Sequence, residues 1–237
     1  MFLATALCFC GSLEGEKLLP IPHTFTSSDG RTLRSMILSK TETSIRVLRA
    51  DDGRQFSLSL ENLSAEDQAL VSEWQAPKEN GPGDRALAFG RANLGGRVGK
   101  GECAHLAVES LKAAGAAPRG KDSPRRGDYV WGDLVAFIPA GKGAAEVTAL
   151  LKKVKPGDLI QIYGARFKGK RSAGGTYFSN ADHHTVMVEW VDSEDGGVIH
   201  ILHQNVGGIR SVMRGSYKLA DFKKGWLRVY RPVAAFP

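Results

Sequence analysis

Two neighbouring segments of the sequence, 183–191 and 198–205, alternate apolar and polar residues and constrain the fold more than any other feature. A period of two is typical of β-strands, because successive side chains point to opposite faces of a sheet. The glycine-containing segment 192–197 predicts a turn between them, so we expect an antiparallel pair. Further strands are predicted at 159–163, 209–213 and 226–232. The second half of the chain therefore predicts an antiparallel sheet.

The same alternation places polar side chains on the apolar faces of these two strands. His184 shares its face with two valines and a tryptophan, whereas His183 falls on the opposite face. On the returning strand, His203 and Asn205 share their face with isoleucines. We therefore expect His184, His203 and Asn205 to be neighbours inside the protein, either as core residues that satisfy one another or as parts of a functional site.

Cys103 lies at the start of a predicted helix, 103–114, in which small and apolar residues recur at helical spacing. The backbone N–H groups and the dipole at a helix start favour a negative charge, so a thiol in the first turn ionises more easily. The charge of the neighbouring Glu102 opposes this ionisation. Two interpretations stay open: a nucleophile, and a small buried cysteine that fills a gap in the core.

Together, these residues could supply a nucleophile, a base and an orienting partner. His184 would take the proton of Cys103 and later protonate the leaving group, and His203 or Asn205 would fix the tautomer of His184. Backbone N–H groups at the start of the cysteine helix could stabilise an oxyanion. A zinc site from Cys103, His184 and His203 is a weaker alternative, because the sequence has no close-spaced ligand pair there. We expect neither a metal nor a cofactor.

The N-terminal residues 2–13 form an apolar run that is too short to span a bilayer and suits the core of a signal peptide. We therefore expect a leader at 1–15, an exported protein, and no other membrane-spanning segment. Removal of the leader would take Cys8 and Cys10 with it and leave Cys103 as the single cysteine, which favours a reactive thiol or an intermolecular link. The net charge of +7 permits an anionic partner, but we interpret it as promoting solubility and expect no nucleic-acid partner.

Residues 23–74 predict a compact β-rich unit, with strands at 32–38, 43–48 and 55–60. The segment Asp51-Asp52-Gly53 predicts a hairpin turn, because glycine accepts the positive φ that such turns need. Ser64 is positioned to cap a short helix, with Asp67 as its third residue. The closing helix completes a small barrel-like unit.

A polar segment rich in proline and glycine, 75–84, predicts a linker between this unit and a second domain at 85–232. The second domain begins with a predicted helix at 85–93. Its basic, glycine-rich segment 164–182 predicts a long loop, which is either an anion-attracting rim or simply solvated.

Residues 23–74 contain motifs that resemble a known family. These motifs are Asp-Gly-Arg-Thr, Asp-Asp-Gly-Arg and Leu-Glu-Asn-Leu-Ser-Ala-Glu-Asp-Gln. These residues resemble the Sla-type SH3-like homology domain. The resemblance implies a five-stranded SH3-like barrel and a role in binding a protein partner or in targeting.

A second resemblance covers most of 85–232, in the motifs Gly-Glu-Cys-Ala-His-Leu-Ala, Asp-Tyr-Val-Trp-Gly, Pro-Gly-Asp, His-His-Thr-Val-Met-Val and His-Gln-Asn-Val. They resemble the Bbc-type cysteine-proteinase-fold domain, which is similar to CHAP and NlpC-type amidases and peptidases with a permuted papain-like fold. The resemblance implies an α+β fold with a helix packed on an antiparallel sheet.

Carried over to this sequence, the resemblance implies Cys103 as nucleophile, His184 as base and Asn205 as polar partner. His203 stands where CHAP enzymes have a glutamate, and an imidazole cannot offer the fixed charge of a carboxylate. Among the residues of the same motifs, we expect Glu102, Trp131 and Gln204 to contact substrate.

Two functions follow from these observations. The first is an exported cysteine hydrolase that cleaves amide bonds of a peptide or cell-wall peptide through a thioester, with the SH3-like domain for targeting. The second is a non-catalytic protein-binding or scaffold module that retains the proteinase fold.

Overall fold

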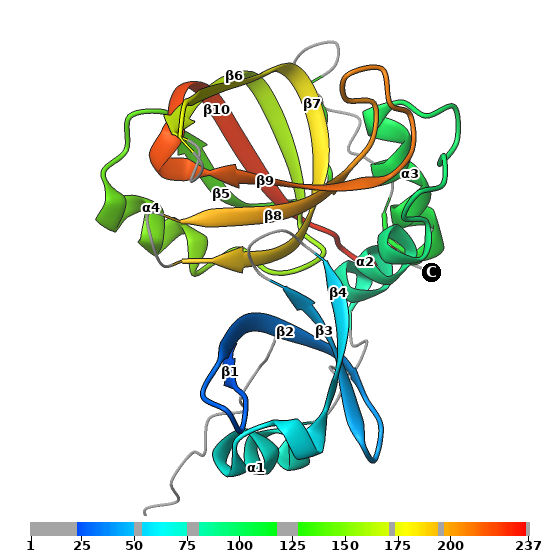
Figure 1. Cartoon of the computed structure of the whole chain (residues 1–237). Helices are drawn as coiled ribbons and strands as arrows, with labels where there is room; N and C mark the ends of the chain where they lie inside the picture. Colours follow the sequence, from blue (N-terminus) through cyan, green and yellow to red (C-terminus); the bar gives the residue numbers. More distant parts are fainter. Residues whose placement is uncertain are drawn as a thin grey trace, which may run out of the picture.

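The computed structural model describes residues 23–49, 54–74, 81–117, 128–170, 174–193 and 197–235 (Figure 1). The predicted leader and the turn at 51–53 lie outside these residues. The described residues form two antiparallel sheets accompanied by few helices, which confirms the α+β class. None of the helices in the described residues is long and apolar enough to cross a membrane.

The first sheet is a four-stranded meander in which each strand pairs antiparallel with the next. Its elements are β1 (His23–Thr26), β2 (Thr32–Lys40), β3 (Ser44–Arg49), β4 (Gln55–Ser59), the short 3₁₀ helix η1 (Leu60–Asn62) and α1 (Ala65–Glu73). As predicted, the hydroxyl of Ser64 accepts a hydrogen bond from the Asp67 N–H at 3.2 Å and caps α1. The expected closed five-stranded barrel is not shown, because the described strands form an open sheet of four.

The second sheet has six strands in the order β5-β10-β6-β7-β8-β9. Its strands are β5 (Asp133–Pro139), β6 (Leu159–Lys170), β7 (Thr176–Asp192), β8 (Val198–His203), β9 (Met213–Lys218) and β10 (Phe222–Arg231), and the accompanying helices are α2 (Pro82–Ala92), α3 (Cys103–Ala113), α4 (Ala144–Leu151) and the 3₁₀ helix η2 (Leu219–Asp221). The antiparallel pair predicted from the alternating segments is β7 and β8. The helix predicted around Cys103 is α3.

The predicted loop at 164–182 is wrong, since most of it belongs to the long hairpin of β6 and β7. Along β6, Ala165 and Phe167 are buried, while Lys168 and Lys170 are exposed to solvent. The basic residues thus occupy the solvent face of a strand, and their charge hid an alternation of period two. The strand predicted at 209–213 also differs, because β9 begins only at Met213.

The six-stranded sheet is apolar on both faces. Ile162 and Val188 belong to a core on the side of α4, whereas Leu159 and Met187, on the same strands, belong to a core on the side of α2 and α3. Figure 1 shows α2 and α3 on one side of the sheet and α4 on the other. An inward-facing residue of these strands can therefore lie in either of two cores.

The two sheets contact each other through β2, β3 and β7. Met36 and Leu48 pack against the buried Trp190, whose indole stacks on the His200 ring at 3.5 Å. The guanidinium of Arg34 forms an ion pair with Asp192 at 2.7 Å. This small apolar contact and its ion pair join the first sheet to the second.

Candidate functional site

Cys103 is the first residue of α3, as predicted, and Glu102 is the N-cap. The chain reaches the helix through Gly99 and Gly101, which have φ values of 56° and 82°. Such positive φ angles favour glycine, because a Cβ would clash there. The His105 Nδ1 accepts a hydrogen bond from the Glu102 N–H at 3.3 Å. The loop and the first turn of the helix thus hold the thiol in one place.

Gln204 fastens this loop to the end of β8. Its amide nitrogen donates to the Glu102 carbonyl at 2.7 Å and the Val98 carbonyl at 3.1 Å, and its amide oxygen accepts from the Val98 N–H at 3.2 Å. The side chain is completely buried. Gln204, expected to contact substrate, therefore positions the start of the cysteine helix and has no free surface to offer a ligand.

Asn205 contacts Glu102 rather than an imidazole. Its amide nitrogen donates to the Glu102 carboxylate at 2.7 Å, and Arg210 forms a longer ion pair with the same carboxylate at 3.4 Å. Asn205 has φ 65°, a left-handed conformation that asparagine tolerates better than most residues. Glu102, also expected to contact substrate, is half-exposed and is held by these two partners.

His184 and His203 form a pair of buried imidazoles, as the alternation predicted. The His184 Nε2 lies 3.4 Å from the His203 Nδ1, a hydrogen bond whose donor depends on the tautomers. Burial, and then repulsion from His203, lowers the pKa of His184 to about 4. Burial also lowers the pKa of His203 to about 4. Both rings are therefore neutral near pH 7.

The thiol of Cys103 lies beside the main chain of β7. Burial raises the pKa of the Cys103 thiol and the charge of Glu102 adds to the rise, while the N–H groups of Thr185 and Ala104 oppose it. Within the residues that the structure describes, the thiol makes no hydrogen bond to an imidazole. The thiol is therefore protonated at neutral pH.

The body of α3 packs on one face of β7, and the His184 side chain alternates onto the other face. α3 packs on the face of the sheet that carries Met187. His184 lies next to Ile162 on the neighbouring strand, and Ile162 belongs to the core on the α4 side. Along β7, His184 alternates with Thr185 and Met187, whose side chains point to the opposite face. The sequence alternation correctly predicted that His184 points inward, but the core that it enters is the one away from α3.

His183 lies on the same face of β7 as Met187, the face on which α3 packs, but it lies beyond the part that the helix covers. It is exposed to solvent and its ring contacts that of Tyr163 at 4.8 Å. The alternation did not single out this residue, because only one face of the strand was expected to be core. The signal that could have found it is the apolar Met187 on the same face.

Trp131, the third residue expected to contact substrate, is completely buried. Its indole N–H donates to the Gln161 side-chain oxygen at 3.3 Å, and the Thr185 hydroxyl donates to the same oxygen at 2.9 Å. Trp131 therefore supports the strand beside the thiol from within the core.

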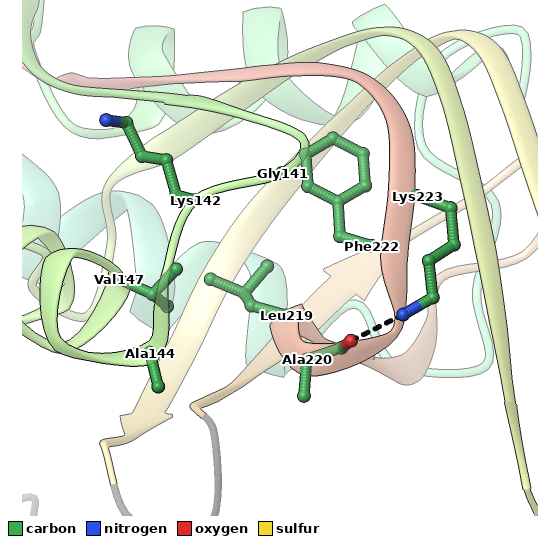
Figure 2. A pocket seen from close by; sticks show the side chains of 8 residues that line it. All are labelled: Gly141, Lys142, Ala144, Val147, Leu219, Ala220, Phe222 and Lys223. Carbon is green, nitrogen blue, oxygen red and sulfur yellow. Dashed lines mark hydrogen bonds between the residues drawn. The ribbon is translucent and has the colours of Figure 1, made fainter.

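A pocket of about 360 Å³ lies elsewhere, between α4 and η2 (Figure 2). It is lined by Lys142 and Lys223 over an apolar floor that includes Phe222, and the Lys223 ammonium donates to the Ala220 carbonyl at 2.9 Å. No cysteine or histidine lines it. In the described ranges, no group of three or more His, Cys, Asp or Glu residues could hold a metal ion.

A cysteine at the first residue of a helix packed on an antiparallel sheet that carries histidines is the arrangement of a cysteine-proteinase fold. Sequence comparison makes the family specific. Residues 68–236 match the model of the AIM3/BBC1 cysteine proteinase-fold domain, and the chain belongs to this family. The match confirms the Bbc-type resemblance. It does not cover β1 to β4, so it gives no support to the expected SH3-like domain.

Two similar proteins complete the comparison. The Debaryomyces hansenii protein named Altered inheritance of mitochondria protein 3 is 25% identical over 160 residues, which are 66% of this chain and 16% of that protein. The chain thus spans a small part of that relative's length. A solved structure titled "The crystal structure of Ly7917" is 21% identical, with a TM-score of 0.37, and the match covers 65% of this chain and 63% of that chain.

The expectation of export is wrong. The relative is named for the inheritance of mitochondria, which points away from an exported protein. The argument that Cys103 is the single cysteine of an exported chain loses its basis with it, because that argument required removal of a leader.

Proposed function

We propose that this chain is a non-catalytic protein-binding module that retains the cysteine-proteinase fold. The observation that carries the proposal is the set of partners around Cys103. His184 bonds to His203 and Asn205 bonds to Glu102, and among the residues that the structure describes no imidazole hydrogen-bonds to the thiol. A nucleophile needs a base within hydrogen-bonding reach, and the base needs an orienting group.

The charges around the thiol support the same conclusion. An activated cysteine depends on a nearby positive charge that stabilises its thiolate. Here both imidazoles are neutral, because burial lowers their pKa values to about 4. The charge of the Glu102 carboxylate adds to burial in raising the pKa of the thiol. These groups favour a thiol that stays protonated.

The first sheet adds a second surface to the proposed module. The sequence motifs of residues 23–74 that resemble SH3-like homology domains support a role in binding or targeting a protein partner. The contact of Met36 and Leu48 with Trp190 would hold this surface in a set position against the second sheet.

The test is the reactivity of Cys103 towards iodoacetamide in the intact chain, measured by mass spectrometry of the peptide that contains Cys103 so that Cys8 and Cys10 do not interfere. We expect alkylation at pH 7 no faster than that of a free model thiol, and no change in His184→Ala. Rapid alkylation at pH 7 that slows in His184→Ala would overturn the proposal and support the hydrolase that the CHAP and NlpC-type resemblance implies.

A further inference from the structure

Four rings follow one another across four adjacent strands of the second sheet: Phe137 on β5, Trp226 on β10, Tyr163 on β6 and His183 on β7. The ring centroids of successive members lie 6.3, 5.4 and 4.8 Å apart. Tyr163 is the direct cross-strand partner of both Trp226 and His183. We call these four residues the aromatic row.

The aromatic row lies at the surface. Phe137 is 44% exposed and Tyr163 is 38% exposed, His183 is exposed and Trp226 is half-exposed. The four rings share the face of the sheet on which α3 packs, because Tyr163 alternates with the buried Ile162 of the opposite core. An exposed set of contiguous rings on a sheet face is typical of an interaction surface.

Three members of the row, Trp226, Tyr163 and His183, carry polar side-chain atoms. Among the described residues, the Trp226 indole N–H, the Tyr163 hydroxyl and the His183 imidazole make no hydrogen bond within the chain. Cross-strand aromatic pairs also stabilise sheets, but that role does not need polar atoms at the surface. These groups are therefore available to a ligand.

The row and the neighbouring Arg228 offer hydrogen-bond donors, the Tyr163 hydroxyl and the His183 ring can also accept, and none of these residues carries a carboxylate. The Arg228 guanidinium lies over the Trp226 ring at 4.3 Å and over the Phe137 ring at 5.9 Å. Its charge is paired with Asp128 at 3.0 Å, a carboxylate that is buried beneath it. An indole N–H and a guanidinium can only donate hydrogen bonds. A matching ligand presents apolar rings and acceptors, and it needs no strong negative charge.

We propose that the aromatic row binds a proline-rich segment of a partner protein in the polyproline II conformation. The inference rests on the proposed binding function. Proline lacks an N–H group, so such a segment offers only carbonyl acceptors between its apolar rings. Aromatic-lined surfaces bind this preformed helix in other proteins. Four strands spaced about 4.8 Å apart span roughly 15 Å, the length of about five residues at 3.1 Å each.

The experiment uses the full chain and fluorescein-labelled decaproline, followed by fluorescence anisotropy at about 150 mM salt, with a glycine-serine decamer as control peptide. Binding of decaproline is expected to saturate, and the control peptide is expected not to bind. Phe137→Ser and Trp226→Ala are expected to weaken binding about tenfold, the loss typical of a central interface residue. Phe178→Ser is the matched control, because Phe178 is 68% exposed but lies outside the row.

A further variant separates the polar contribution from the rings. Tyr163→Phe removes only the hydroxyl and is expected to weaken binding about threefold, as for the loss of one hydrogen bond. Circular dichroism of each variant establishes that it is folded, and Phe137→Ser and Tyr163→Phe keep the inference testable if Trp226→Ala does not fold.

Several results would overturn the inference. They are the lack of saturable binding, equal affinities in the row variants and the wild type, and preferential binding of a uridine decamer at the same salt concentration. Mass spectrometry of the decaproline after incubation tests the proposed function separately. Cleaved peptide would overturn the proposed non-catalytic function. Peptide that stays intact but does not bind would overturn only the inference that the aromatic row binds proline-rich segments.

Discussion

The imidazoles of His184 and His203 lie 3.4 Å apart between Nε2 and Nδ1, and only 7% and 9% of these residues is exposed. Each ring thus satisfies a buried nitrogen of the other, in the core on the α4 side of the sheet. Because the two neutral rings hydrogen-bond to each other, this sheet can bury both histidines without a carboxylate as a partner.

The pair makes the stability of the protein depend on pH. Each pKa is lowered from its ordinary value of 6.5 to about 4, so between these values the unfolded chain binds protons that the folded chain does not. The contribution of the neutral rings to the free energy of unfolding is therefore fully present above pH 6.5, and it is lost as the pH drops towards 4. We expect a loss of about 2 kcal/mol for each ring between pH 7 and pH 4.5, and the buried His200, whose pKa burial also lowers to about 4, adds a similar loss.

Urea unfolding at several pH values checks this dependence. Wild type is compared with His203→Gln, in which one ring of the pair is removed while His184 and His200 still titrate. The slope between pH 6.5 and 4.5 is expected to be shallower in the variant. Identical slopes would mean that the pair does not titrate as the geometry implies.

Gly215 on β9 gives the His203 ring its space. A Cβ at this position would lie 2.9 Å from the His203 Nε2, closer than real Cβ contacts. We expect Gly215→Ala to destabilise the protein by about 1–3 kcal/mol, the usual cost of overpacking a core. Thermal unfolding measures the loss.

Gly143→Ala is the matched control, because nothing lies within 4 Å of a Cβ there and its φ is −68°. Gly143 is the N-cap of α4, where alanine is disfavoured relative to glycine, so a loss of up to about 1 kcal/mol is expected, smaller than that of Gly215→Ala. Equal effects of the two substitutions would contradict the role assigned to Gly215.

Gln204 holds the loop before α3 by three hydrogen bonds to Val98 and Glu102. In Gln204→Ala these buried main-chain groups lose their partner, and we expect a loss of about 2–3 kcal/mol. Faster hydrogen exchange of the Val98 amide, measured by NMR, would locate the effect.

Arg210→Ala tests the specificity of that effect. Arg210 pairs with Glu102 at 3.4 Å in an exposed setting, where ion pairs contribute about 0–1 kcal/mol. A loss in Arg210→Ala as large as that in Gln204→Ala would show that the loop is held by charge rather than by the buried amide.

Trp190 joins the two sheets through Met36 and Leu48. Its replacement by alanine leaves a cavity at the contact, and we expect a loss of about 3–5 kcal/mol together with separate unfolding of the two sheets. Differential scanning calorimetry distinguishes one transition from two. A single, unchanged transition in Trp190→Ala would contradict this role for the contact.

Local patterns were sufficient for several elements. The helix that starts at Cys103, the pair β7 and β8, and the Ser64 cap each follow from residues close together in the chain. Helical periodicity, strand alternation and side-chain capping are all local effects, so a single segment carries them. The Bbc-type family was also evident from short motifs, and the family match confirms it.

Other features could not be recognised locally. No local pattern predicted β5 or α4, and the segment 164–182, where β6 and β7 form a hairpin, has the composition of a loop. In β6, basic residues alternate with Ala165 and Phe167, and a charged strand face resembles a loop until a partner strand is in place. Gln204 was expected to contact a ligand. It is instead buried and hydrogen-bonded to the main chain of the loop before α3, because that loop folds over it.

The sequence by itself determined that Cys103 begins a helix and that His184 and His203 point into a core. The tertiary structure alone decided that this core is the one away from α3, and that exposed rings from four strands meet in the aromatic row. The physical reason is that alternation assigns a side chain to one of two faces. Which layer covers each face depends on packing between segments that are far apart in the chain.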